Sequence, residues 1–210
     1  MIGVFGGTFD PIHFGHLRTA VEVMEALALT ELRFVPCRIP PHRAAPQAPA
    51  EVRLTLLQLA LEGCESGFRI DDRELRREGQ SYMVDTLSSI RSEVSDQPIC
   101  LIVGLDAFQG IPAWHRWRDL FKLAHVVVMQ RPFEASYAEA LERVLEERLI
   151  TEPSWLKSKS SGYIYFQEVS QLAISASRIR ELVRHRKSTQ YLLPDRVREF
   201  IAANGLYRAE

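Results

Sequence analysis

Short apolar runs of β-like composition alternate with helical segments along most of this chain. These apolar runs lie at 2–5, 32–35, 68–71, 98–103 and 125–129. Each run ends at glycine or proline or is followed by polar residues. Helical periodicity or composition marks the segments between them, at 17–27, 51–61 and 84–94. Strands that alternate with helices in this way predict an α/β fold, with a parallel sheet covered by helices on both faces.

The last part of the chain is less regular. Residues 136–149 have the composition of a charged helix, 151–161 read as a polar loop, and 163–166 as a late strand. Two short helices are expected at 177–185 and 194–204, the second with Pro194 at its start and Gly205 after its end. Since no repeat or linker divides the chain, we expect one domain over 1–210, with a helical C-terminal part from about 170 to 210.

Composition narrows the classes of partner. The 26 Lys and Arg residues nearly balance the 27 Asp and Glu residues, so the net charge is −1. Such a chain is not a general polyanion binder, and we expect no nucleic acid and no membrane partner. No apolar run approaches the roughly 18 residues of a membrane span. The three cysteines, at 37, 64 and 100, form no Cys-x-x-Cys pair, which favours reduced thiols in a soluble cytoplasmic protein.

The loop between the first strand and the first helix, Gly6 to His16, reads GGTFDPIHFGH. In an open parallel sheet, ligands bind at turns of this kind. Glycines let the backbone approach a phosphate, and the helix start offers free amides and a positive dipole end. The string matches neither Gly-x-Gly-x-x-Gly nor a Walker loop. It therefore predicts a phosphate site of another type, and we call residues 6–16 the glycine loop.

His13 and His16 stand three residues apart at the end of this loop. That spacing lets both imidazoles face one anion. The alternative is that one or both histidines pack or cap the helix. A zinc site is a poor interpretation, because no third ligand has suitable local spacing. We therefore expect no protein-bound metal cage here.

His13-Phe14-Gly15-His16 resembles the His-x-Gly-His signature of the nucleotidylyltransferase superfamily, and the longer string from Gly6 is similar to that of bacterial nicotinate mononucleotide adenylyltransferases. The likeness covers nearly the whole chain and continues through Pro40-Pro41-His42-Arg43, Gly104-Leu105-Asp106, Pro112-Ala113-Trp114 and Ile174-Ser175-Ala176-Ser177-Arg178-Ile179-Arg180. The resemblance implies a Rossmann-like, doubly wound parallel sheet with a small helical C-terminal appendage. It also implies adenylyl transfer from ATP to nicotinate mononucleotide in NAD biosynthesis, with Mg²⁺ accompanying ATP.

The resemblance also implies an ATP side of the site. Its residues are Gly6, Gly7, Thr8, Phe9, Gly15, Gly104, Asp106, Ile174, Ser175, Ser177 and Arg180. Among the candidates, His13, His16 and Arg180 are the catalytic ones, because they would stabilise charge on the phosphates. Asp106 would contact the ribose, with a helix cap as the alternative. From the residues alone, Ser175 or Ser177 caps the next helix, and Arg178 and Arg180 fall in its first turn.

The acceptor side is expected around a loop with prolines at 36, 40, 41, 46 and 49. The resemblance makes His42 and Arg43 candidates for the mononucleotide phosphate, with a solvent-facing pair as the alternative. It makes Trp114 a candidate for stacking on the pyridine ring, with a hydrophobic plug as the alternative. Backbone amides around Met83 and His115 are expected near the nicotinate carboxylate.

Some features depart from the family pattern or belong to neither side. Met83 and Cys37 stand where threonine and asparagine are common in the family. Trp117 is expected to pack in the core.

Two other functions stay open from the sequence: adenylylation of another phosphate, such as nicotinamide mononucleotide or phosphopantetheine, and a non-catalytic nucleotide-binding module. The sequence also leaves the oligomeric state open, including a homo-oligomer.

Overall fold

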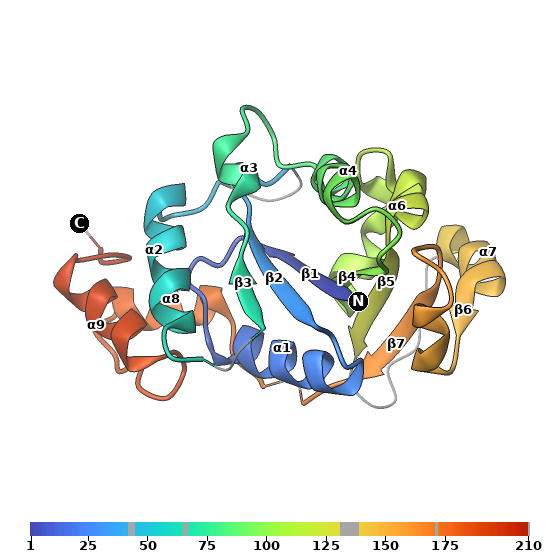
Figure 1. Ribbon diagram of the computed structural model, residues 1–210. Coiled ribbons are helices and arrows are strands. Elements are labelled where there is room, and N and C mark those ends of the chain that lie inside the picture. The colour runs from blue at the N-terminus through green and yellow to red at the C-terminus, as the bar shows by residue number, and fades with distance from the viewer. Residues whose placement is uncertain (42–44, 65–66, 131–138, 171, 210) are drawn as a thin grey trace.

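The computed structural model describes residues 1–41, 45–64, 67–130, 139–170 and 172–209. Within these ranges, the chain forms a seven-stranded sheet in the order β3-β2-β1-β4-β5-β7-β6 (Figure 1). Every neighbouring pair of strands is parallel. The strands are β1 Ile2–Gly7, β2 Glu31–Pro36, β3 Phe68–Ile70, β4 Ile99–Gly104, β5 His125–Gln130, β6 Leu149–Ile150 and β7 Ile164–Glu168. The predicted α/β class with a parallel sheet is confirmed.

Both faces of the central strands β1, β4 and β5 are buried, which explains their unbroken apolar runs. Successive side chains of a strand point to opposite faces. Phe5 lies in register with Phe34 and Ile102, and this row belongs to one core cluster. Val4 and Leu101, one position earlier on their strands, belong to the cluster on the other face. A strand that is buried on both faces does not alternate apolar with polar residues, as the sequence predicted.

Helices cover the two faces in separate groups (Figure 1). Their bounds are α1 Phe14–Ala26, α2 Ala50–Leu61, α3 Arg73–Arg76, α4 Met83–Val94, α5 Leu105–Gln109, α6 Trp117–Leu123, α7 Glu139–Arg148, α8 Ala176–Arg184 and α9 Asp195–Ala203, with 3-10 turns η1 Ile111–Ala113 and η2 Pro153–Lys157. Apolar residues of α1, α2, α8 and α9 share one core cluster, and those of α4 to α7 share the other. Across the described stretches, every helix is too short or too polar to pass through a lipid bilayer.

The segment 136–161 differs from its prediction. The expected helix begins in residues that lie outside the described ranges, and it ends at Arg148 rather than Leu149. Leu149–Ile150 instead pairs with β7 as the edge strand β6. The expected loop 151–161 contains the turn η2, in which Leu156 is fully buried. Two strand residues and one turn are too short to show a period, so only their pairing and burial reveal them.

Three short helices, α3, α5 and α6, were also absent from the prediction, since none exceeds seven residues. α6 begins at Trp117, which is 8% exposed and packs edge-on against Phe121 with ring centroids 6.2 Å apart. The expectation that Trp117 packs in the core is confirmed.

The order of the strands creates a crevice at one place. β1 lies between β2 and β4, so the chain leaves β1 toward one side of the sheet and returns to β4 on the other. The helices α1 and α4 accordingly pack on opposite faces. In open α/β sheets, ligands bind beyond the carboxyl ends of strands at such a switch point. The glycine loop follows β1 and Asp106 follows β4, so both lie at this edge.

Candidate active site

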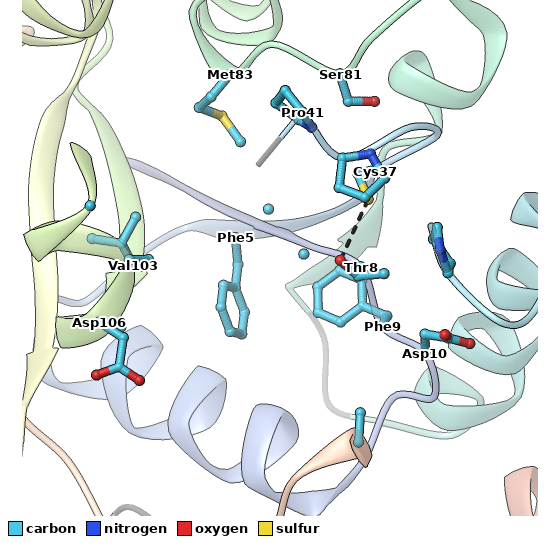
Figure 2. A pocket seen from close by; sticks show the side chains of 18 of the residues that line it. Phe5, Thr8, Phe9, Asp10, Cys37, Pro41, Ser81, Met83, Val103 and Asp106 are labelled. Carbon is cyan, nitrogen blue, oxygen red and sulfur yellow. Dashed lines mark hydrogen bonds between the residues drawn. The ribbon is translucent and has the colours of Figure 1, made fainter. Parts of the chain in front are cut away.

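A cavity of about 920 Å³ opens at this switch point (Figure 2). This volume is in the range of small-molecule and cofactor sites, roughly 300–1,000 Å³. It joins the glycine loop, the end of β4, the start of α4, the turn after η1 and the start of α8. Of the sequence-predicted residues, those that line it are Gly6, Gly7, Thr8, Phe9, His16, Met83, Gly104, Asp106, Trp114, His115, Ser177 and Arg180. His42 and Arg43 lie outside the described residues.

The start of the glycine loop exposes backbone to the cavity because Gly6 and Gly7 carry no side chain. A Cβ on Gly7 would meet the ring of Phe9 at 2.8 Å, and one on Gly6 would collide with the methyl of Met83. Phe9 has a φ of 48°, and its ring is buried edge-on against Phe5 with centroids 5.8 Å apart. This packing fixes the loop, and Gly6, Gly7 and Thr8 line the cavity beside the two rings.

His13 and His16 are brought together as predicted. Their rings are stacked with centroids 3.8 Å apart and an interplanar angle of 25°. His13 occupies the N-cap position of α1, yet its side chain makes no capping hydrogen bond. Only His16 lines the cavity; His13 is 5% exposed and lies behind it. Gly15 also does not line the cavity, and a Cβ there would meet the His13 ring at 2.9 Å.

Burial lowers the pKa of His13 to about 4. The imidazole is therefore neutral near pH 7 and carries one N–H donor rather than a full charge. The prediction that both imidazoles face one anion therefore holds in the structure only for His16, whereas the His13 ring is buried behind it and supports it by stacking.

The second candidate anion-binding element is the start of α8. Ser175 is its N-cap, as predicted, and its Oγ accepts a hydrogen bond from the Arg178 backbone N–H at 3.2 Å. Arg178 pairs with Glu181 at 2.8 Å and does not line the cavity. Ile174 and Ser175 also lie away from it, so they shape the turn rather than its surface.

Arg180 is the cation of this element, and it lies in the second turn of α8 rather than the predicted first turn. This correction follows from the helix start at Ala176, which makes Arg180 the fifth residue. One terminal nitrogen donates to the Asp10 carbonyl at 2.6 Å, and the other lies 3.5 Å from Ser177 Oγ. Its Nε is buried without a hydrogen-bond partner among the described residues. Arg180 thus keeps donor capacity for a ligand.

Asp106 lies at the end of β4, on the cavity wall (Figure 2). The alternative that it caps a helix is wrong, because Gly104 holds the cap position of α5 and Asp106 is the second residue of that helix. Its carboxylate is exposed and accepts no side-chain hydrogen bond from the described residues. It is therefore available to a polar ligand.

The acceptor wall, which we define as Ser81–Met83 with Trp114 and His115, combines backbone and aromatic groups. Met83 is the first residue of α4, so its N–H is among the free amides of a helix start. The rings of Tyr82 and His115 are 4.4 Å apart between centroids and tilted by 34°. Trp114 is half-buried against the α4–α6 core and also lines the cavity. Its packing and its accessibility are both compatible with a stacking role.

A buried acid behind this wall was missed by sequence reasoning. Glu74 is 3% exposed, lines the cavity, and accepts a hydrogen bond from Thr86 Oγ1 at 2.5 Å. Burial raises the pKa of the Glu74 carboxyl, against the opposing effect of hydrogen bonds with Thr86 and Ser81. Ser81 Oγ in turn accepts from the Arg38 backbone N–H at 2.9 Å. Glu74 lies in a segment rich in Arg and Glu, which has no local signal of burial.

Cys37 lies beside the glycine loop. Its Sγ donates to Thr8 Oγ1 at 3.7 Å, the dashed contact in Figure 2. Burial raises the pKa of this thiol, so it stays protonated near neutral pH. Cys37 therefore contributes shape and a weak hydrogen bond to Thr8 at this position.

Arg53 and Asp10 tie the glycine loop to the proline-rich segment. The Arg53 guanidinium, only 1% exposed, donates to the carbonyls of Thr8 at 2.7 Å, Arg38 at 3.2 Å and Ala48 at 3.2 Å. Asp10 accepts from the backbone N–H groups of Gln47 at 2.8 Å and Ala48 at 3.2 Å. Arg53 belongs to α2, and nothing in the helix pattern indicates that it is buried.

Three comparisons place this site among known proteins. The cytidylyltransferase-like family model matches residues 4–182. A protein named "Probable nicotinate-nucleotide adenylyltransferase" from Methylococcus capsulatus is 57% identical over 208 residues, covering 99% of both chains. One of the same name from Pseudomonas fluorescens is 45% identical over 210 residues, covering 99% of this chain and 97% of the relative.

The fold has a similar solved structure, Plasmodium falciparum nicotinic acid mononucleotide adenylyltransferase complexed with NaAD. The TM-score is 0.75 at 16% identity, with 98% of this chain and 96% of that chain covered. At this identity the likeness supports the fold, a parallel sheet with C-terminal helices. The family model and the two relatives lead to one conclusion. The chain belongs to the cytidylyltransferase-like family and, within it, to the nicotinate-nucleotide adenylyltransferases.

Proposed function

We propose that this chain transfers the adenylyl group of ATP to nicotinate mononucleotide, forming nicotinate adenine dinucleotide and pyrophosphate. One observation carries the proposal. A single cavity joins two anion-binding elements, the glycine loop with His16 and α8 with Arg180, to a wall with an indole ring and the start of α4. That combination suits a triphosphate beside an aromatic ring that carries an anionic group.

The reaction is an in-line displacement. An oxygen of the mononucleotide phosphate attacks the α-phosphorus of ATP, and the bond from that phosphorus to the bridging oxygen breaks as pyrophosphate leaves. The attacking oxygen is already anionic near neutral pH, so no general base and no covalent enzyme intermediate are needed. The protein contributes position and charge stabilisation.

Each catalytic residue has a distinct role in this proposal. His16 donates a hydrogen bond to the ATP phosphates from the cavity wall, and the neutral His13 ring stacked behind it fixes its orientation and adds a donor. Arg180 holds the β and γ phosphates with the nitrogens that Asp10 leaves available. Asp106 contacts the ribose from the carboxyl end of the neighbouring strand β4. These groups act most strongly where water is excluded.

Mg²⁺ fits the site as a companion of the phosphates. The described residues contain no cluster of three or more His, Cys, Asp or Glu able to hold a metal. Mg²⁺ commonly keeps several waters and binds through one or two carboxylates plus phosphate oxygens. Asp106, with its exposed carboxylate on the cavity, is the residue that would reach it through water. When bound, the ion supplies neutralisation of the negative charge on the leaving pyrophosphate.

The acceptor is held by groups of another kind. Trp114 stacks on the pyridine ring, and backbone amides at Met83 and His115 donate to its carboxylate. His42 and Arg43 bind the mononucleotide phosphate in this proposal. We treat residues 1–210 as one nucleotidyltransferase domain, because the C-terminal helix α8 supplies Arg180 to a cavity built by the N-terminal loop. We place the enzyme in the cytoplasm, where its three cysteines, all free in the structure, stay reduced.

A pyrophosphate-release assay with a panel of acceptors tests the function. We expect turnover with ATP and nicotinate mononucleotide, and much less with nicotinamide mononucleotide or phosphopantetheine. Preferred turnover with phosphopantetheine would assign a different acceptor. ATP binding with no turnover on any acceptor would make the chain a nucleotide-binding module and overturn the proposal.

A further inference from the structure

Tyr207, near the C-terminus, reaches the glycine loop. Its side chain is 9% exposed, and its hydroxyl donates to Asp10 Oδ1 at 2.7 Å across 197 positions of sequence. Its φ is 61°, in the left-handed region that non-glycine residues rarely occupy. Strain of this kind persists where the surrounding structure holds it, commonly at functional sites. The contact is thus held in place against an unfavourable local backbone conformation.

Asp10 connects this tyrosine to the proposed ATP site. Its carboxylate accepts from Tyr207 and from the backbone N–H groups of Gln47 and Ala48. Its backbone carbonyl accepts from Arg180 at 2.6 Å, and the same arginine nitrogen lies 3.9 Å from Asp10 Oδ2. Arg180 is therefore close enough to shift from the carbonyl toward the carboxylate with a small movement.

The Asp10 carboxylate and a bound phosphate compete for Arg180. A carboxylate at 4% exposure needs donors, because burial of an unsatisfied charge is strongly unfavourable. The Tyr207 hydroxyl supplies one donor from the side of the C-terminal segment. Burial, and then the hydrogen bond to Asp10, raise the pKa of Tyr207 well above its usual range, so its hydroxyl keeps its proton at neutral pH. Without that donor, the Arg180 nitrogen that lies 3.9 Å from Asp10 Oδ2 is a cation close enough to compensate the carboxylate.

We propose that Tyr207 is a positioning residue for ATP, whose hydroxyl satisfies the Asp10 carboxylate and so keeps Arg180 available for the β and γ phosphates. This inference rests on the proposed function, since the binding of those phosphates by Arg180 is part of it. The hydroxyl touches neither substrate and acts only through Asp10 and Arg180.

The test is Tyr207→Phe, which removes the hydroxyl and keeps the ring. Since the lost hydrogen bond is to a charged group, KM for ATP should rise about tenfold, with kcat and KM for the mononucleotide within about twofold. Two variants serve as controls. Tyr191→Phe removes the same atom from a side chain that is 81% exposed. Ile201→Val thins the core under α9, where Ile201 is 4% exposed, and lowers stability without touching Asp10.

Both controls should leave KM for ATP unchanged. An unchanged KM for ATP in Tyr207→Phe, or an equal rise in Ile201→Val, would show a purely structural role and overturn the inference. If Tyr207→Phe is too unstable at room temperature, all variants are assayed in the cold with trimethylamine N-oxide, which strengthens burial. The same two criteria then apply.

A double-mutant cycle with Arg180→Ala tests the route of the effect. In that background, Tyr207→Phe should add less than about twofold to KM for ATP, because the residue it acts through is gone. If the two substitutions raise KM for ATP by factors that simply multiply in the double mutant, the inference is overturned. If Arg180→Ala alone leaves KM for ATP unchanged, the proposed phosphate site itself is wrong. A large effect of Arg180→Ala with none from Tyr207→Phe would reject the positioning role and leave the proposed function intact.

Discussion

The proposed ATP side and the proposed acceptor wall of the cavity are built in different ways. On the ATP side, the glycine loop is continuous in sequence, and its side chains are fixed by ring packing and by the hydrogen bonds of Asp10 and Arg53. The acceptor wall combines the start of α4 with the turn between η1 and α6, which meet through the Tyr82 and His115 rings. The first offers charge and N–H donors from side chains, and the second offers backbone amides and aromatic surface. A preformed, locked region suits phosphate chemistry, whereas the wall suits selection of the acceptor.

The largest effect is expected at the ATP side. His16→Ala should leave the fold intact and lower kcat by about 10²–10³, the usual loss for one donor to a transition state. Steady-state kinetics with circular dichroism measure both. His185→Ala is the matched control, because His185 is exposed just after α8. A His16→Ala enzyme that keeps half of the wild-type turnover would make this histidine structural.

The buried His13 predicts a pH dependence of stability. Its folded pKa of about 4 lies below the ordinary value of 6.5, so the unfolded chain binds more protons between these values. Stability is therefore fully present above pH 6.5 and is lost as the pH falls toward 4, by about 3 kcal/mol from this group. Urea unfolding of the wild type and His13→Asn at pH 7 and pH 4 isolates this contribution. An equal loss of stability in both proteins would mean that the His13 ring is solvated. It would also contradict the contrast between a locked glycine loop and the acceptor wall.

Selection of the acceptor should come from the wall. Nicotinate mononucleotide should exceed the amide in kcat/KM by about 10², because an amide turns its NH₂ toward donors that a carboxylate would satisfy. We expect a preference of this size because Met83 lines the cavity with an apolar side chain, which has no hydroxyl to add a donor. Kinetics with both acceptors at saturating ATP measure the ratio. A ratio near one would contradict a donor-lined pocket.

The smallest expected effect separates the two regions most directly. Trp114→Ala should raise KM for the mononucleotide about tenfold, since aromatic stacking contributes roughly 1–3 kcal/mol, and leave KM for ATP nearly unchanged. Trp155→Ala is the control, because Trp155 is 55% exposed and lies away from the cavity. Equal rises for both substrates would indicate general loss of structure. No rise for either would make Trp114 a plug in the wall.

Local features of this chain were predictable from the sequence. The parallel sheet followed from alternating strand and helix patterns, and the position of the glycine loop followed from its place after β1. A serine N-cap at Ser175 or Ser177 followed from residue type, and the structure assigns it to Ser175. Apolar periodicity, glycine and capping residues act over a few neighbouring positions, so a sequence displays them directly. The roles of His16 and Arg180 came from resemblance, and they stay predictions.

The contacts that hold the site together could not be predicted from the sequence. Tyr207 donates a hydrogen bond to Asp10, Arg53 donates to three backbone carbonyls, and Glu74 lies buried behind the acceptor wall. The two-residue strand β6 exists because β7 pairs with it. The sequence by itself determined the longer strands and helices, their order, and the place of the loop that is predicted to face a phosphate. Only the tertiary structure decided which distant polar groups share a buried space, because a hydrogen bond between remote residues depends on packing rather than on any local pattern.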